Sequence, residues 1–546
     1  MPENVIVADK IKISAFETIR SINGDKVIAE SYPGYLVDES KISGGHAQWL
    51  CFPTNEQEIV SVINKMKEEN QAITISAART GIVGSAVPLL GGAVVSLERM
   101  DDFIGLGYDE EESKWFARVQ PNITLNVINE IVKLKKIEES QSIPLEKNWI
   151  EKFNEEPIMF YPIDPTEMTA SIGGCIAANA SGARTFKYGA TRDWVRRLRV
   201  IISTGEVLEI PRGKYKAKDG VFIIKTAEQE FEIKVPTYQL PKAKNAAGLY
   251  TTPEMDLIDL FIGSEGIFGF ITEADVWLKD YIPHISNVAF FTNEVDAIKF
   301  VNLLRSSSKF KPEFMEYFDN NALTLLRDTQ KVDPKFVDMP NIPEEAKTAI
   351  SFDLGYKEDT LEETFKEIGL MLEKCNSSLK DTWSAYEERE LDRFKHFRHA
   401  VPEIVNNIIA ERKKKYPSIH KLGTDMSVED EYIGEMMEFY HKILNEVGLE
   451  YVIWGHIGDN HVHVNILPKN MEDLELGKQL YKKFAQKAVS FGGSVSAEHG
   501  IGKIKHEYLE IMFGNEAINE MRQVKSTLDP NFLFNPGNIF SKEVTQ

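Results

Sequence analysis

The sequence predicts an α+β fold in two domains, and its length and two contrasting patterns support this prediction. The chain has 546 residues, whereas a single hydrophobic core stops growing at about 250–300 residues. Short strands and small-residue loops fill its first half, and longer helices alternate with strands beyond residue 281. We therefore expect an N-terminal segment (1–47), a first domain (48–280), a second domain (281–519) and a C-terminal segment (520–546) that packs back on the first domain.

The first domain opens with strand, helix, strand, turn and strand over residues 51–97. Thr54 and Gln57 predict a capping box, and the apolar residues after them mark one face of a helix. Residues 72–77 and 93–97 have the apolar patterns of strands, and a loop of small residues joins them.

Three glycine-rich stretches lie in the first half, at 76–86, 171–182 and 263–269, each beside an apolar strand. Small residues let backbone N–H groups approach a phosphate closely. One such stretch alone is more typical of a turn, but three in one half favour anion-binding loops. None contains GxGxxG or GxxxxGK[ST], so the sequence supports neither a Rossmann dinucleotide site nor a P-loop.

Further along, residues 206–236 combine short strands with charged turns, which predicts a hairpin insertion. Residues 296–306 and 361–374 predict helices in the second half. The stretch LDPNFLFNPGNIF near the C-terminus predicts the loop that returns to the first domain.

The charge and the cysteines exclude several classes of protein. With 63 Lys and Arg against 84 Asp and Glu, the net charge is −21, which argues against a general nucleic-acid binder. Cys51, Cys175 and Cys375 are too few and too far apart for a usual iron–sulfur cluster or a CxxC zinc site. No signal peptide or membrane span is apparent, so we expect a cytoplasmic protein.

Three of the 11 histidines lie within one short segment. On a strand, His461, His463 and Asn465 would point to one face. His456 joins them only if the chain bends, and Gly458–Asp459 is where it could bend. We interpret the cluster as a site of metal or proton chemistry; the alternative is a set of hydrogen-bonded core histidines.

A carboxylate and an imidazole adjoin downstream, at Glu498 and His499. Two imidazoles and one carboxylate form a common ligand set for a divalent metal that keeps positions open for substrate. His499 would then be free to act as a base beside the ion. Taken alone, the pair is equally typical of a protein surface.

Together these segments resemble one family. Five segments each resemble signatures of the FAD-dependent D-2-hydroxy-acid dehydrogenases, namely the D-lactate dehydrogenases, glycolate oxidase flavin subunits and D-2-hydroxyglutarate dehydrogenases. These segments are PIDPTEMTASIGGCIAANASGARTFKYG, GSEGIFGFITEA, GHIGDNHVHVN, SAEHGIGKIK and LDPNFLFNPGNIF. These are flavoproteins of the vanillyl-alcohol-oxidase type. The resemblance implies a two-subdomain, PCMH-type FAD-binding domain and an α+β cap domain for substrate and metal.

The resemblance also implies roles for individual residues. Residues that match FAD-binding positions, with the flavin held non-covalently, are Ser76, Ala77, Ala78, Arg79, Thr80, Gly81, Ser85, Pro165, Thr166, Thr169, Gly173, Gly174, Asn179, Gly182, Glu265, Gly266 and Ile271. His456, His463 and Glu498 match the ligands of a divalent metal, for which Zn, Mn and Fe stay open. His499 matches the catalytic base, and the substrate-binding positions are Arg398, Asn465, Lys505 and Asn535.

Two departures from the family bear on these roles. The family's pyrophosphate loop usually reads RGGGT, whereas this chain has Ala77 and Ala78 at two glycine positions, so we expect only negative φ angles there. Pro402 and Gly423 replace the Thr and Lys that help the 2-hydroxyglutarate enzymes bind a second carboxylate, although Lys421 is nearby. These losses favour a monocarboxylate substrate.

A third departure is His461, where the family has Asn. It could be an additional ligand, a partner of a ligand or a polar strand residue. The expected function is metal-assisted oxidation of a D-2-hydroxy acid, D-lactate first, by hydride or carbanion transfer. The electrons would pass to a quinone, a cytochrome or an electron-transfer flavoprotein.

Other functions and partners stay open. They are oxidation of D-2-hydroxyglutarate or glycolate, a flavoprotein like the alkylglycerone-phosphate synthases, and a non-catalytic subunit of an oxidase complex. We expect no nucleic-acid partner, and leave open peripheral membrane contact and a homodimer.

Overall fold

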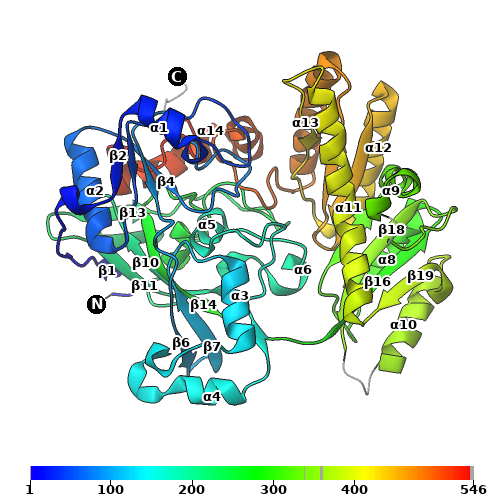
Figure 1. Cartoon of the computed structure of the whole chain (residues 1–546), viewed down its shortest axis with the longest axis horizontal. Helices are drawn as coiled ribbons and strands as arrows, with labels where there is room; N and C mark the ends of the chain where they lie inside the picture. Colours follow the sequence, from blue (N-terminus) through cyan, green and yellow to red (C-terminus); the bar gives the residue numbers. More distant parts are fainter. Residues whose placement is uncertain (1, 337–338, 357–360, 542–546) are drawn as a thin grey trace.

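The computed structural model describes residues 2–336, 339–356 and 361–541. Two halves stand side by side, each built on its own sheets with helices packed over them (Figure 1). The first half contains the N-terminal elements, and the second half begins with β16 (His284–Phe291). The predicted α+β class is confirmed. The expected segments 1–47 and 520–546 include residues 1 and 542–546, which lie outside the described residues.

Three sheets form the first half, in the strand orders β2-β3-β5-β4, β11-β10-β14-β7-β6-β8 and β1-β12-β13. Their strands are β1 (Val5–Val7), β2 (Ser21–Asn23), β3 (Trp49–Cys51), β4 (Ile73–Ser76), β5 (Ala93–Ser96), β6 (Phe103–Asp109), β7 (Lys114–Val119), β8 (Ser142–Ile143), β10 (Val195–Ile201), β11 (Val207–Pro211), β12 (Val221–Lys225), β13 (Glu230–Lys234) and β14 (Phe270–Trp277). The helices are α1 (Asp25–Ser31), α2 (Glu56–Glu68), α3 (Leu125–Leu134), α4 (Trp149–Glu155), α5 (Ile172–Ala178), α6 (Thr185–Tyr188) and α7 (Ile258–Phe261). A separate two-stranded pair joins β9 (Met159–Phe160) to β15 (Lys279–Asp280).

The second half has one seven-stranded antiparallel sheet in the order β19-β16-β18-β17-β21-β22-β20. Besides β16, its strands are β17 (Met315–Phe318), β18 (Thr348–Gly355), β19 (Thr382–Ala385), β20 (Leu422–Gly423), β21 (Tyr451–His456) and β22 (His461–Ile466). Its helices are α8 (Glu294–Arg305), α9 (Asn320–Val332), α10 (Leu361–Glu373), α11 (Glu388–Lys413), α12 (Ile433–Val447) and α13 (Met471–Ser490). The central strands β17 and β21 carry site residues, so the sheet fixes their positions.

The chain then returns to the first half through α14 (His506–Leu528), which packs against β13 and also contacts α13 (Figure 1). Lys525 on this helix donates to the carbonyl oxygen of Ile267. Beyond the helix, Phe534 forms a parallel bridge with Ile73, and the Asn535 side chain accepts from the Ile75 N–H at 2.7 Å. The end of the chain thus completes the edge of the first sheet.

Most of the expected elements form. The strands predicted at 72–77 and 93–97 are β4 and β5, and the hairpin insertion contains the antiparallel pair β12 and β13. The two helices predicted in the second half are α8 and α10.

The predicted capping box is wrong by one residue. Asn55, not Thr54, caps α2 by accepting from the Glu58 N–H at 3.0 Å. Glu58 returns the bond, because its carboxylate accepts from the Thr54 N–H at 2.8 Å. Asparagine is a stronger N-cap than threonine, which agrees with its position here.

Within the described ranges, none of the helices combines the length and the apolar content that a bilayer crossing requires.

Candidate active site between the two halves

The loop after β4 is the first of the three glycine-rich stretches. Arg79 alone among residues 76–81 has a left-handed backbone, with φ of 60°. Ala77 and Ala78 keep negative φ, as expected for residues with a Cβ. A Cβ built on Gly81 meets nothing within 4 Å, so the loop faces open space. The guanidinium of Arg79 lies over the ring of Tyr35, 4.5 Å from its centroid.

The second stretch bends around α5. The Ser171 hydroxyl caps this helix at Gly174, and Asn179 ends it in the left-handed conformation with φ of 48°. Gly182 follows in close contact with the chain, because a Cβ there would lie 2.1 Å from the Asp164 carbonyl oxygen. Pro165, Thr166 and Thr169 belong to the loop before α5, and Gly173 and Gly174 lie in its first turn.

The third stretch ties the first half to the C-terminal region. The buried carboxylate of Glu265 accepts from the N–H groups of Ile501 and Gly502 and from the Ser85 hydroxyl. The Asn535 amide donates to the Glu265 carbonyl oxygen at 2.8 Å. The side chains of Glu265 and Asn535 therefore hold loops together. Ile271 lies nearby on β14.

In the second half, a tight turn after His456 lets this residue lie beside the other histidines of the segment. Residues 457–459 form a 3-10 turn between β21 and β22, and His456 pairs directly with His461 across the hairpin. Directly opposed residues of an antiparallel pair share one face of the sheet. The bend predicted at Gly458–Asp459 therefore brings His456 to the face of His461 and His463.

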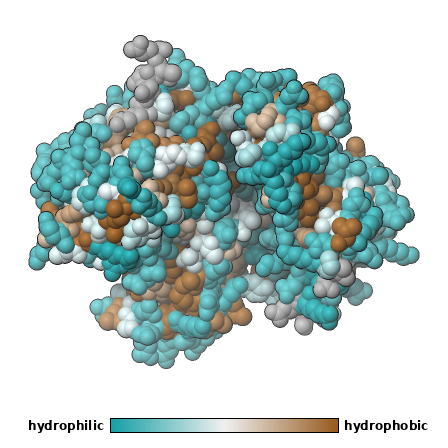
Figure 2. Space-filling model, turned by 45° about the horizontal axis from the view of Figure 1, so that its top comes forward, coloured by the Kyte–Doolittle hydropathy of each residue, from teal (hydrophilic) through white to brown (hydrophobic). Residues whose placement is uncertain are grey.

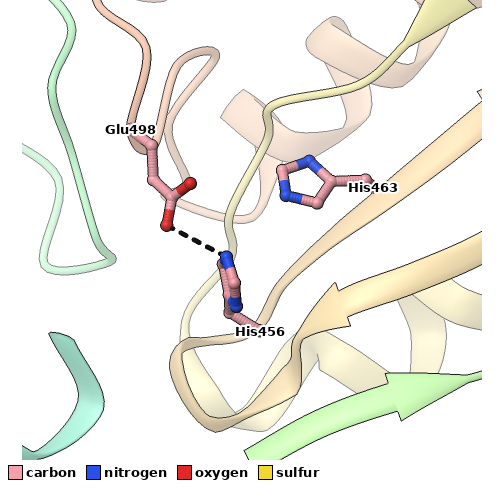
Figure 3. A group of neighbouring side chains, drawn as sticks. All are labelled: His456, His463 and Glu498. Carbon is pink, nitrogen blue, oxygen red and sulfur yellow. Dashed lines mark ion pairs between the residues drawn. The ribbon is translucent and has the colours of Figure 1, made fainter. Parts of the chain in front are cut away.

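His456, His463 and Glu498 converge on one point (Figure 3). One ligand atom of each lies within 4.8 Å of the others, as a shared metal ion requires. The backbone oxygen of Thr424 lies 3.0 Å from His463 Nδ1. This partner holds the proton on Nδ1 and leaves Nε2 as the donor atom. Burial, with the nearby His461 and His456, lowers the pKa of His463 well below its ordinary value, so the ring is neutral.

Charges around Glu498 keep it ionised. Burial would raise its pKa, but Lys244, His456 and His461 hold it well below its usual value. All three contacts use Oε1: Lys244 forms an ion pair, and the nitrogens of His456 and His461 lie at 3.3 and 3.6 Å. In the part of the chain that the structure describes, no contact engages Oε2, which is therefore available to a metal. His461, which is fully buried, contacts Glu498 and lies outside the convergent group.

Asp425 organises the residues around His499. Its Oδ2 lies 3.0 Å from His499 Nδ1 and 2.7 Å from Lys505 Nζ, and its Oδ1 lies 3.1 Å from His461 Nε2. Burial would raise the pKa of Asp425, but His499, Lys505 and His461 keep it well below its usual value. With Nδ1 of His499 held by this carboxylate, Nε2 is the atom that can take up a proton.

Arg398 lies on α11 and pairs with Glu316 on β17. Nε of Arg398 donates to Oε2 at 2.7 Å and Nη2 to Oε1 at 3.1 Å. Burial opposes both charges, yet their attraction lowers the pKa of Glu316 and raises the pKa of Arg398. Glu316 Oε1 also lies 3.3 Å from His456 Nδ1. The predicted carboxylate-binding arginine is thereby linked to a predicted metal ligand.

The structure brings some predicted substrate residues to this cluster and not others. Asn465 is buried on the same strand as His463 and donates to its carbonyl oxygen. Lys505 joins through Asp425. Asn535, in contrast, uses its side chain on the backbone of the first half. Glu316, Asp425 and Lys244 complete the cluster, although the sequence interpretation included none of them.

A cavity of about 540 Å³ opens between the halves, next to the cluster. It lies along the groove that separates the two halves in Figure 2. Lys244 and Asp459 line this cavity with their charged atoms 3.7 Å apart, and Lys244 also forms the ion pair with Glu498. Other lining residues come from both halves: Asn179, Ser181, Phe186, Arg305, Asp430 and Asn460.

Family models match most of the chain. The model of the FAD binding domain matches residues 47–138 and 151–211, and the model of the C-terminal domain of FAD linked oxidases matches residues 285–539.

Several curated proteins are similar along nearly their whole length. A D-lactate dehydrogenase of Anaerostipes hadrus is 27% identical, covering 98% of this chain and 98% of the relative. The glycolate oxidase subunit GlcD of Bacillus subtilis is 25% identical over 96% and 97%. A D-2-hydroxyglutarate dehydrogenase of Stutzerimonas stutzeri is 26% identical over 94% and 95%.

Among solved structures, alkyldihydroxyacetonephosphate synthase superposes with a TM-score of 0.58. The match covers 97% of this chain and 90% of that one at 15% identity, which is a likeness of fold.

Proposed function

The chain belongs to the FAD-linked oxidases, and we propose that it oxidises a D-2-hydroxy acid, D-lactate first, to the 2-oxo acid. The observation that carries this proposal is the convergence of a proton acceptor, a metal-type ligand group and a carboxylate-binding arginine. The proton acceptor is His499, the metal-type ligand group includes His456, and the arginine is Arg398. Each part serves oxidation of a 2-hydroxy acid: the base takes the hydroxyl proton, the metal would lower the pKa of the hydroxyl, and the arginine orients the carboxylate.

FAD supplies the electron acceptor, taking two electrons from the substrate. The loops of the first half fit such a cofactor, because the face at Gly81 is open and Gly182 lies in a closely packed turn. Ser181 adds a buried hydroxyl, 6% exposed, that has no hydrogen-bond partner among the described residues. We propose that residues 76–81, 165–174 and 179–182 line the cofactor.

A divalent metal would polarise the substrate hydroxyl and lower its pKa. The donor set fits this ion: contacts of other atoms leave His463 Nε2 and Glu498 Oε2 for it, and His456 Nε2 already lies 3.3 Å from the Glu498 carboxylate, where one ion could bind both. These nitrogen and oxygen donors suit Zn, Mn or Fe.

The protein's own residues handle the proton and the carboxylate. We propose that His499 Nε2 accepts the hydroxyl proton, while Asp425 holds the ring in place and offsets the resulting positive charge. The edge of Arg398 that Glu316 does not occupy would bind the substrate carboxylate through two N–H groups. Both groups orient the Cα–H bond of the substrate.

A second candidate is a 2-hydroxy acid with a second carboxylate, such as D-2-hydroxyglutarate. Lys421 favours it, because within the described residues this cation contacts no carboxylate and packs 5.9 Å from the Trp454 ring centroid. Trp454 pairs with His463 across the hairpin, which puts Lys421 near the cluster. Against it, Pro402 and Gly423 offer no donor side chain.

The test is anaerobic reduction of the bound flavin. We expect D-lactate to bleach the FAD absorbance, with D-2-hydroxyglutarate, glycolate and longer 2-hydroxy acids as comparisons. If none of these acids reduces the flavin, the proposed reaction is wrong. A chelator should stop bleaching while FAD stays bound, and full activity after verified metal removal would refute the role of the ion.

The proposal includes an acceptor other than nicotinamide. A quinone, a cytochrome or an electron-transfer flavoprotein would reoxidise the flavin, and we propose a cytoplasmic location. Steady-state assays with each acceptor class separate these cases.

A further inference from the structure

Glu316 lies at the centre of the cap sheet, level with His456. The pairs Tyr317 with Gly455 and Phe318 with Trp454 set the register of β17 and β21. One residue further along this register, Glu316 faces His456. The side chain is buried, with 8% of the residue exposed. A buried carboxylate requires partners that satisfy its charge.

One carboxylate serves two partners of different function. Oε1 lies 3.3 Å from His456 Nδ1, and both oxygens accept from Arg398, at 2.7 and 3.1 Å. We propose that Glu316 is a positioning residue that orients the metal ligand His456 and the substrate-binding Arg398 together. This inference rests on the proposed function and adds a residue that couples its metal and its carboxylate subsites.

The contact with His456 determines which nitrogen is the donor. Both ring nitrogens of His456 lie 3.3 Å from a carboxylate oxygen, Nδ1 from Glu316 and Nε2 from Glu498. A metal held between His456, His463 and Glu498 would take the lone pair of Nε2, and the proton would then stay on Nδ1, where Glu316 can accept it. Without Glu316, the ring could rotate or exchange tautomers. Metal affinity would fall because the correct arrangement would have to be selected at the moment of binding.

The contact with Arg398 determines which edge of the guanidinium is free. Of its five N–H donors, Nε–H and one Nη2–H bind Glu316, and Phe314 covers one face at 4.0 Å from the ring centroid. Among the described residues, no hydrogen bond uses the Nη1 hydrogens or the second Nη2 hydrogen, which leaves the outer edge of the guanidinium available. That edge matches the two oxygens of a carboxylate.

A nearby carboxylate provides a matched control. Glu313, three residues before Glu316, is also buried, at 3% exposure, and also pairs with a cation, Lys187. It contacts neither His456 nor Arg398 in the described chain. Substituting Glu313→Gln therefore removes a buried ion pair without touching the proposed coupling.

The experiment uses the FAD-loaded protein after removal of metal by a chelator. Wild type, Glu316→Gln and Glu313→Gln are titrated with Co²⁺, whose visible absorption reports its coordination. D-lactate kinetics follow with saturating metal. We expect Glu316→Gln to weaken Co²⁺ binding by about 10–100-fold, alter the absorption bands and raise KM at least about 10-fold, with a smaller change in kcat. Glu313→Gln should match wild type in all three.

The outcomes separate the inference from the proposed function. Co²⁺ binding, bands and KM of Glu316→Gln equal to wild type would overturn the inference. A wild type that takes up no Co²⁺ would refute the metal role, and an unchanged KM in Glu316→Gln would then overturn the Arg398 part. If Glu316→Gln loses FAD or fails to fold, Glu316→Asp keeps the charge but is too short for both partners, and the same shifts are expected.

Discussion

The two halves build their sides of the site by different means. In the first half, the proposed cofactor loops rely on backbone geometry: a left-handed Arg79, an open Gly81 and a close approach at Gly182. In the second half, buried charged side chains such as Asp425 and Glu316 hold the proposed reacting groups through ion pairs. Backbone loops can enclose a cofactor, whereas proton and metal chemistry needs side chains with defined charge.

This difference predicts that single side-chain changes in the second half abolish chemistry and leave FAD bound. His499→Ala should lower the rate of flavin reduction by about 10³-fold or more, because it removes the proton acceptor. Stopped-flow absorbance under anaerobic conditions measures this rate. His420→Ala is the control, since His420 is exposed and, among the described residues, bonds only Ser418 of its own turn. Reduction at the wild-type rate would disprove the assignment of the base.

Asp425→Asn tests whether flavin reduction depends on the negative charge of Asp425 or only on the shape of its side chain. Asparagine is nearly isosteric but cannot offset a protonated imidazole, so we expect flavin reduction about 10²-fold slower. The pKa of Asp425 is held well below its usual value, so the wild-type carboxylate stays charged at any pH of assay near neutrality. The same rate in both proteins at pH 6 to 8 would show that the charge plays no part.

Gly182→Ala tests the backbone half. The added Cβ would lie 2.1 Å from the Asp164 carbonyl oxygen and force the loop to move. We expect FAD to dissociate at least about 10-fold more readily, because the loop must be strained to rebind it. Fluorescence of released FAD measures the Kd. Gly434→Ala, on α12 with nothing within 4 Å of the new Cβ, should have no effect; equal affinities in the two variants would contradict the role of this turn.

Lys503 is a charged side chain that bonds the backbone of a first-half loop, and its removal should have the smallest effect. Its ammonium is partly buried, lies 3.0 Å from the Ser85 carbonyl oxygen and also contacts Asn538. Burial lowers its pKa from 10.5 to about 8, against the attraction of Glu265. Between pH 8 and 10 the unfolded chain therefore binds more protons than the folded one, and this residue makes the free energy of unfolding rise with pH.

Urea unfolding at pH 8 and 10 measures this rise. Between pH 8 and 10, the free energy of unfolding should rise by about 1–3 kcal/mol more in the wild type than in Lys503→Gln. Identical pH dependence in the variant and the wild type would mean that Lys503 keeps an ordinary pKa.

The sequence predicted what depends on local patterns. The strands around the first loop and the hairpin bend at Gly458–Asp459 are encoded by neighbouring residues, and they form as expected. The shift of the α2 cap from Thr54 to Asn55 is a local error, because adjacent residues competed for the same role.

The remaining site residues depend on sheet register and on long-range packing. Asp425 lies 73 residues from the Glu498 N–H that it binds, and Lys244 lies 254 residues from Glu498. No periodicity relates such distant positions. One signal was present: Glu316 is the single charge in an otherwise apolar strand, and a buried charge there needs a functional or structural partner.

The bond between the Ile75 N–H and Asn535 spans 460 residues. A ribosome that adds about 5–20 residues per second needs roughly 20 to 90 s to make that stretch. During this time the first sheet lacks the bridge and the hydrogen bond that residues 534 and 535 supply. Until that segment is made, the nascent first half relies on its other contacts to avoid aggregation.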